Sequence, residues 1–249
     1  MMLEIKNVHV SYGKQEVLKG ASVSIFKGEI LSIIGANGCG KTTLLKSAAG
    51  IIPRSGEVIA DGEPLCCGGG TAKRIAYLAQ GRSAPGMTVG EMVLHGRFPY
   101  LSYPRRYSEN DRRIAREAME SVGIAEHAER TVSELSGGMR QAAYIAMALA
   151  QGTDYILLDE PTTYLDVRHQ LSLLHLLQKL AESGKGIAAV MHDLPLAFAL
   201  SDKIAVMENG IAVAYGTPSE IYTHECIGRI FGIRLKKDED GYRYVAGEG

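Results

Sequence analysis

Residues 35–43, GANGCGKTT, combine three closely spaced glycines with a lysine and two threonines. Glycines allow successive backbone N–H groups to converge on phosphate oxygens without a clash from a Cβ atom. An apolar run at 29–34 precedes this segment and a helical pattern at 41–49 follows it, so the segment opens a helix whose N-terminus attracts anions. In that setting the GxxxxGK[ST] spacing predicts a phosphate-binding loop rather than an accidental glycine-rich turn.

The side chains of this loop have distinct expected tasks. The ammonium group of Lys41 reaches the β- and γ-phosphates, and the hydroxyl of Thr42 binds Mg²⁺. The motif predicts a bound nucleotide but does not define the fate of that nucleotide. The residues expected to contact it are Gly35, Ala36, Asn37, Gly38, Cys39, Gly40, Lys41, Thr42 and Thr43.

Two acidic residues end a second apolar run, ILLDE at 156–160. In phosphate-loop ATPases the first such acid helps to hold Mg²⁺, and its neighbour polarises the attacking water. We assign these roles to Asp159 and Glu160. A buried strand that ends in solvated acids would look the same, and the phosphate loop upstream favours the catalytic interpretation.

A second glycine-containing helix start, LSGG at 135–138, lies far from the first in the sequence. The hydroxyl of Ser136 and the free N–H groups of the helix start could cap a phosphate. The same residues also fit an ordinary N-cap serine followed by flexible glycines. One nucleotide site has no need of two such loops, so the second loop requires a separate explanation.

Hydrophobic periodicity indicates which elements position these motifs. Strands are predicted at 2–10, 21–26, 29–34, 56–60, 74–79, 154–158, 186–191 and 203–208, and helices at 41–49, 88–95, 110–122, 138–151, 167–182 and 194–200. Alternation of strands and helices predicts an α/β fold with a parallel-sheet core. The first 30 residues predict a small antiparallel β subdomain, and 83–153 an inserted α-helical subdomain. The segment after 232 is either a short hairpin or a loose end.

Composition narrows the class of protein. The chain has 27 basic and 28 acidic residues, a net charge of −1, so no overall basic field predicts nucleic-acid binding. Its four cysteines include no CxxC pair, which argues against a zinc site or a disulfide framework and favours a reducing, cytoplasmic compartment. No apolar run approaches the roughly 18 residues that span a bilayer. We therefore expect a soluble chain that reaches a membrane only through a partner.

The order of the motifs gives the chain a family resemblance. LSGGMRQ, with Ser136 placed 23 residues before Asp159, resembles the signature of ATP-binding cassette ATPases. The likeness to their nucleotide-binding subunit runs from about residue 3 to 230. It implies a RecA-like P-loop NTPase domain at 1–236, a tail at 237–249, and ATP with Mg²⁺ as cofactors. It also explains the second loop, because such cassettes form head-to-tail homodimers with ATP. Ser136, Gly137 and Gly138 of one copy then face the ATP held by Lys41 of the other.

The same resemblance assigns four further residues. Tyr12 matches the aromatic residue that stacks on adenine, and Gln80 matches the glutamine that senses Mg²⁺ and the attacking water. Asp166 matches the dimer-contact loop. His192 matches the switch histidine at the γ-phosphate, whereas the other six histidines are interpreted as structural. An ordinary strand-end tyrosine and a structural histidine are the alternatives for Tyr12 and His192.

Two positions depart from the common family pattern. Met139 stands where the signature usually has glutamine, and Thr42 replaces the commoner serine. Because Ser136 and the backbone make the main phosphate contacts, and threonine keeps the hydroxyl, we expect activity to survive both changes.

Three further segments are similar to one importer branch, the ATPases of iron–siderophore, haem and cobalamin uptake: 96–100, 160–170 and 191–210. The likeness implies two transmembrane permease subunits, an extracytoplasmic substrate-binding protein, and a position on the cytoplasmic face of the membrane. Residues 97–107, RFPYLSYPRRY, are either the edge that meets the permease or an ordinary surface loop.

Other functions remain as alternatives. An importer of metal ions or small organic solutes would carry the same motifs. A soluble cassette protein of DNA repair, the ribosome or iron–sulfur assembly is disfavoured by the lack of a second cassette, a coiled-coil insertion or a basic arm. A phosphate-loop kinase or GTPase does not explain LSGG or His192.

Overall fold

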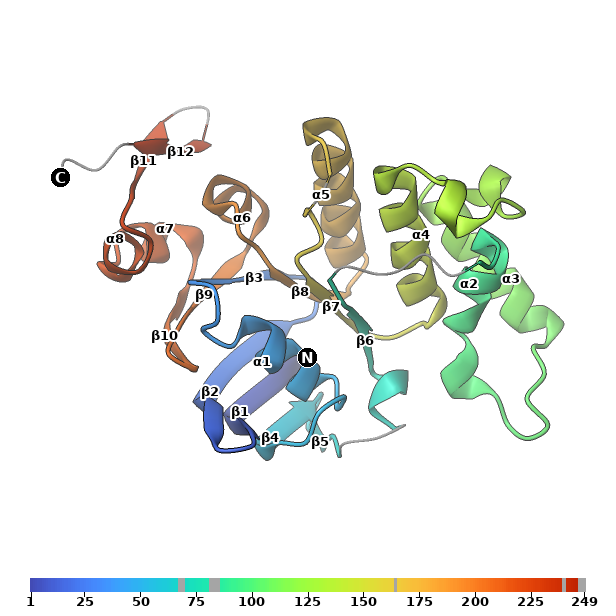
Figure 1. The fold of residues 1–249 in the computed structure, drawn as a ribbon, viewed down its shortest axis with the longest axis horizontal. Helices are drawn as coiled ribbons and strands as arrows, with labels where there is room; N and C mark the ends of the chain where they lie inside the picture. Colours follow the sequence, from blue (N-terminus) through green and yellow to red (C-terminus); the bar gives the residue numbers. More distant parts are fainter. Residues whose placement is uncertain (67–69, 81–85, 164, 239–240, 246–249) are drawn as a thin grey trace.

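The computed structural model describes residues 1–66, 70–80, 86–163, 165–238 and 241–245, and its central sheet has the strand order β10-β9-β3-β8-β7-β6 (Figure 1). These strands are β3 (Ile30–Gly35), β6 (Ile75–Leu78), β7 (Tyr155–Asp159), β8 (Gly186–Val190), β9 (Lys203–Glu208) and β10 (Ile211–Gly216). Neighbours from β9 to β6 pair in parallel, and β10 pairs antiparallel at the edge. The predicted parallel-sheet core is confirmed.

A second, antiparallel sheet has the order β2-β1-β4-β5. Its strands are β1 (Met2–Tyr12), β2 (Gln15–Phe26), β4 (Ser55–Ala60) and β5 (Glu63–Pro64). Residues in the first 30 therefore form the small antiparallel sheet that their alternation predicts, and a later segment completes it.

Successive side chains of the central strands point to opposite faces of the sheet and pack in two separate cores. In β3, Leu31 and Ile33 pack with the antiparallel sheet and with α1 (Lys41–Ala48). Ile30 and Ile34 point to the other face and pack in the core that contains the remaining large helices. Because β3, β7 and β8 are buried along their whole length, the sheet is a rigid base for the loops at its ends.

The helical elements lie mostly on that second face (Figure 1). The α-helices are α2 (Val89–His95), α3 (Glu109–Ser121), α4 (Gly137–Ala150), α5 (Val167–Glu182), α6 (Leu194–Leu200), α7 (Pro218–Tyr222) and α8 (Cys226–Phe231). Short 3₁₀ turns lie at Thr71–Lys73, Phe98–Tyr100, Ala125–His127 and Val132–Glu134. The sequence patterns did not predict β5, β10, α7 or α8. None of the helices in the described part of the chain is both long and apolar enough to cross a bilayer.

The predicted helices at 88–95, 110–122 and 138–151 form a separate group, α2 to α4, beside the central sheet (Figure 1). Arg97 ties this group together, because its guanidinium donates to Asp111 at 3.0 Å and to the carbonyl of Ala150 at 2.9 Å. Arg97 is only 8% exposed. It is therefore a packing residue inside the segment 97–107, whereas Tyr103 of the same segment is 96% exposed.

The end of the described chain is a hairpin of β11 (Arg234–Asp238) and β12 (Gly241–Val245). The ring of Tyr242 packs 4.9 Å from that of Phe198 on α6 and 5.6 Å from that of Tyr222 on α7. The hydroxyl of Tyr244 accepts a hydrogen bond from the backbone N–H of Leu194 at 3.1 Å. Of the two possibilities for this segment, the structure shows the hairpin.

A partly buried ionic cluster joins the antiparallel sheet to the central one. The carboxylate of Asp61 lies 2.8 Å from the ammonium of Lys27 and 3.1 Å from the guanidinium of Arg74, and it accepts a 2.6 Å hydrogen bond from Tyr155. Burial opposes ionisation of Asp61, but the hydrogen bonds from Lys27 and Tyr155 outweigh it and lower its pKa. The ionised carboxylate therefore stabilises the folded chain.

We expect Asp61→Asn to lower the free energy of unfolding by about 2 kcal/mol at pH 7, because Lys27 and Arg74 lose their charged partner. Asparagine tolerates the left-handed backbone of this position, where φ is +53°, so the change acts through charge. Since the pKa in the folded chain lies below its ordinary value of 3.8, the difference from wild type should start to shrink as the pH falls below 3.8 and be lost as the pH passes the lower pKa of the folded chain.

Urea unfolding at several pH values measures this difference. Asp154→Asn is the matched control, because Asp154 contacts the same lysine at 3.0 Å but its side chain is 43% exposed. Its effect should be smaller. An Asp61→Asn effect that stays constant with pH would contradict the role of the ionised carboxylate.

Candidate active site

The site lies where β3, β7 and β8 end. Parallel strands present their carboxyl ends at one edge of a sheet, and ligands bind in the crevice outside that edge. β3 leads into the phosphate loop, β7 ends at Asp159, and β8 is followed by His192. Because β8 pairs with both β3 and β7, segments that lie far apart in the sequence meet here.

The phosphate loop wraps around the start of α1. Gly40 is the N-cap residue and has a φ of +106°, which a residue with a Cβ rarely adopts, and a Cβ there would lie 2.8 Å from Leu18 Cδ2. The ammonium of Lys41 is buried and donates to the carbonyl oxygens of Gly35 at 2.8 Å and Ala36 at 3.0 Å. The loop therefore holds a cation against backbone at a helix N-terminus, as phosphate binding requires.

Cys39 lies within the loop but is not available as a reactive group. Its thiol is buried, and this burial raises its pKa despite the opposing charge of Lys41. A protonated, buried thiol acts as a small packing group.

A hydroxyl and a carboxylate meet beside the loop. Thr42 Oγ1 donates to Asp159 Oδ1 at 2.9 Å, and the hydroxyl of Tyr77 donates to Asp159 Oδ2 at 3.0 Å. Asp159 is only 3% exposed, so these donors compensate for its lost hydration. The structure thus brings the predicted pair Thr42 and Asp159 together and adds Tyr77, which no sequence motif marks.

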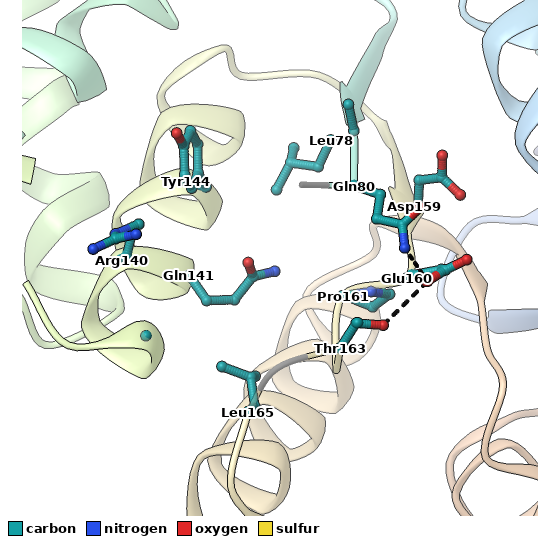
Figure 2. A pocket seen from close by; sticks show the side chains of 12 residues that line it. Leu78, Gln80, Arg140, Gln141, Tyr144, Asp159, Glu160, Pro161, Thr163 and Leu165 are labelled. Carbon is teal, nitrogen blue, oxygen red and sulfur yellow. Dashed lines mark hydrogen bonds between the residues drawn. The ribbon is translucent and has the colours of Figure 1, made fainter. Parts of the chain in front are cut away.

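Glu160 is the centre of a second cluster. Its Oε1 lies 2.5 Å from His192 Nε2. Its Oε2 accepts hydrogen bonds from Gln80 Nε2 and, at 3.2 Å, from Thr163 Oγ1, as Figure 2 shows. The backbone of Glu160 has a φ of +51°, a left-handed conformation that costs a side-chain-bearing residue about 1 kcal/mol. The three residues predicted to surround the attacking water are therefore in direct contact, and the strained backbone directs Glu160 toward Gln80 and His192.

A pocket separates this cluster from α4. Figure 2 shows Gln80, Glu160 and Thr163 along one side, and Arg140, Gln141 and Tyr144 of α4 along the other. Gly137 also lines this pocket. Helix α4 therefore borders the pocket beside Glu160 but does not fill it.

Ser136 caps α4, since its hydroxyl accepts from the backbone N–H of Met139 at 3.4 Å. The ring of His169, on the first turn of α5, lies directly against Gly138, and a Cβ at that position would overlap the ring. Nδ1 of His169 also lies 2.8 Å from the carboxylate of Asp166, which caps α5 through the backbone N–H of His169 at 2.9 Å. His169 thus connects the predicted dimer-contact residue to the second glycine of LSGG, a contact that spacing alone does not reveal.

Not all predicted site residues come together within one chain. The pocket over the phosphate loop is lined by Val17, Asn37, Gly38, Gly40, Lys41, Thr42, Thr43 and Glu160. Gly137 lines one of two other pockets that border α4, and Gly138 lines the other. Tyr12 lies at the end of β1 with its side chain 51% exposed. Val17 is a lining residue that carries no motif and was not predicted.

The contact between His169 and Gly138 generates a test of packing. We expect Gly138→Ala to lower the free energy of unfolding by about 2 kcal/mol, because the ring must move and release Asp166 or the start of α4 must shift. In a His169→Ala background the ring is absent, so the same substitution should cost much less. Urea unfolding of the four proteins measures this coupling, and equal losses in both backgrounds would contradict the contact.

Comparison with known proteins agrees with this geometry. A family model described as ABC transporter matches residues 18–163. The iron(3+)-hydroxamate import ATP-binding protein FhuC of Bacillus subtilis is 42% identical over 93% of this chain and 88% of its own length. The ferric enterobactin transport ATP-binding protein FepC of Escherichia coli is 44% identical over 93% of this chain and 87% of its own length.

Solved structures share the fold. A metal-chelate type ABC transporter in an inward-facing conformation superimposes with a TM-score of 0.83 at 27% identity, covering 98% of this chain and 96% of the other. An ATP-binding cassette in its ADP conformation has the same TM-score at 23% identity, covering 92% and 98%, and this likeness concerns the fold alone. The chain therefore belongs to the ABC transporter family, as an ATP-binding cassette that hydrolyses ATP.

Proposed function

We propose that this cassette energises the uptake of an iron–siderophore, haem or cobalamin-type compound through a separate transmembrane permease. The observation that carries the proposal is the near-full-length similarity to the iron(3+)-hydroxamate import protein FhuC and the ferric enterobactin transport protein FepC, in a chain that brings Glu160 and His192 into contact. The petrobactin import protein FpuD of Bacillus anthracis, 41% identical over 96% of this chain, supports the same cargo class.

Hydrolysis is assigned to the cluster around Glu160. A general base must lie within hydrogen-bond reach of the proton that it abstracts, and its carboxylate must be held in one orientation. Gln80 and Thr163 hold Oε2, while His192 contacts Oε1 from the loop after β8. We assign Glu160 to polarise the attacking water, and His192 and Gln80 to position that water and the γ-phosphate.

ATP binding is assigned to the phosphate loop, with Lys41 as the cation that faces the phosphates. Its ammonium is held in the loop by two carbonyl oxygens, and it offers three N–H donors. Exchange of these contacts for phosphate oxygens replaces neutral acceptors with charged ones, which are stronger. Tyr12, half exposed at the end of β1, is assigned to the adenine ring.

The donors beside the loop fit Mg²⁺, which prefers oxygen ligands. The Thr42 hydroxyl and the buried Asp159 carboxylate are in contact, and Gln80 donates through Nε2 to Glu160, which leaves its Oε1 for a cation. Thr42, Gln80 and Asp159 are the residues that would hold the ion. When bound, Mg²⁺ neutralises charge on the β- and γ-phosphates.

A second copy of the chain is expected to complete each ATP site. Gly137 and Gly138 line pockets other than the one over the phosphate loop of their own chain, so they and the neighbouring Ser136 are assigned to the ATP of the partner. Asp166 is assigned to the contact between copies. The homodimer would work with two permease subunits and an extracytoplasmic substrate-binding protein, on the cytoplasmic face of the membrane.

Lys41→Ala should weaken binding of Mg²⁺–ATP at least about tenfold, because the phosphates lose a charge-assisted donor. Isothermal titration calorimetry measures the dissociation constant directly. Lys46→Ala is the matched control, since Lys46 lies on the same helix and outside the lining of the pocket. Binding that is unchanged by Lys41→Ala would remove this lysine from the assignment.

Glu160→Gln should lower the rate of ATP hydrolysis by about 100-fold or more while ATP binding is retained, because the amide cannot act as a base. Phosphate release measures the rate, and Glu126→Gln, at a side chain that is 81% exposed, is the control. Near-normal turnover of Glu160→Gln would transfer the role of base to another group.

The same variant tests transport. It should trap the ATP-bound complex, so a tagged copy in gently solubilised membranes should copurify a polytopic permease, and the ligand of the associated binding protein would identify the cargo. Recovery of ribosomes, nucleic acid or a soluble assembly complex would overturn the transport proposal. A binding protein specific for free metal ions or small organic solutes would overturn only the cargo class.

A further inference from the structure

We propose that Tyr77 is a positioning residue that fixes the Asp159 carboxylate and thereby sets the affinity of the site for Mg²⁺. The proposal rests on the assignment of Thr42 and Asp159 to Mg²⁺ in the proposed function. Tyr77 itself is not assigned to the metal or to the nucleotide. Its effect would pass through Asp159 to Thr42.

The strand register places Tyr77 where it can act. In the parallel pair of β6 and β7, Tyr77 lies opposite Leu157, and Asp159 follows two residues later. Residues two apart on a strand share a face, so the phenol and the carboxylate point to the same side of the sheet. Tyr77 and Leu157 belong to the core that also contains α1, the helix that begins with Lys41 and Thr42.

Each oxygen of Asp159 then has its own hydroxyl donor. Thr42 donates to Oδ1 at 2.9 Å and Tyr77 donates to Oδ2 at 3.0 Å. The torsion that rotates an aspartate carboxyl group is broad when the group is unrestrained. Donors from two different elements restrict this rotation, and few water molecules compete with them because Asp159 is only 3% exposed.

The direction of the Thr42 hydroxyl follows from this restraint. A hydroxyl has one proton and two lone pairs, and Thr42 gives its proton to Asp159. The lone pairs are therefore free to bind a cation, and their direction depends on where Oδ1 lies. Residues that orient metal ligands in this way typically change metal affinity 10- to 100-fold when they are removed.

Tyr77→Phe is the direct test, because phenylalanine keeps the ring that packs beside Leu157 and removes the hydroxyl. Mg²⁺ is titrated into a mixture of the protein and a fixed concentration of a fluorescent ATP analogue. The fluorescence of the analogue then gives the Mg²⁺ concentration at which the Mg²⁺-dependent change is half complete. We expect this concentration to rise about tenfold. Binding of the analogue without Mg²⁺ should be unchanged, which a general loss of structure would not allow.

Two controls isolate the path through Asp159. Tyr155→Phe removes a tyrosine hydroxyl from the neighbouring strand, but that hydroxyl binds Asp61, so the Mg²⁺ requirement should stay at the wild-type value. In an Asp159→Asn background the effect of Tyr77→Phe should be much smaller than in wild type, because the two changes affect one carboxyl group.

The outcomes separate this proposal from the one on which it rests. An unchanged Mg²⁺ midpoint in Tyr77→Phe, or an equal shift in the Asp159→Asn background, would overturn the role of Tyr77 alone. Wild-type binding of the analogue that does not depend on Mg²⁺ would overturn the Mg²⁺ assignment itself. Urea unfolding midpoints equal to wild type would show that Tyr77→Phe retains its fold.

Discussion

Parallel pairing of β8 with both β3 and β7 is the constraint on which the site depends. These three strands are buried along their length, so their register cannot shift without moving apolar side chains out of two cores. Their shared direction brings the phosphate loop, the two acids and His192 to one edge. A hydrogen bond from Thr42 to Asp159 then spans 117 positions of sequence and joins α1 to the end of β7.

The LSGG segment at the start of α4 belongs to a different part of the molecule. The start of α4 is held by its serine cap and by the ring of His169, and it borders pockets other than the one over the phosphate loop. Through His169, the loop that follows Glu160 and the start of α4 are in contact within one chain.

Much of this site was predictable because its chemistry depends on local sequence. Glycine spacing in the phosphate loop and the acids after an apolar strand are properties of continuous segments. The two sheets were predicted from the hydrophobic patterns of the strands and from their alternation with helices. Tyr77, Val17 and His169 were missed because each acts through a side chain that reaches another element. Nothing in the residues around them distinguishes these positions from ordinary core or helix residues. Arg97 differs from its sequence context in another way. It lies in a segment that looks exposed in the sequence, yet it is buried and donates a hydrogen bond to Asp111.

The hairpin of β11 and β12 has a practical consequence. Tyr244 binds the backbone of Leu194, two residues after His192, and Tyr242 packs on Phe198 of the same helix. The chain contains no tryptophan. A tryptophan introduced at position 242 would therefore be the sole source of indole fluorescence in the protein. Its emission would give a time-resolved optical signal from α6, the helix that follows His192, at a position outside the lining of the pocket over the phosphate loop.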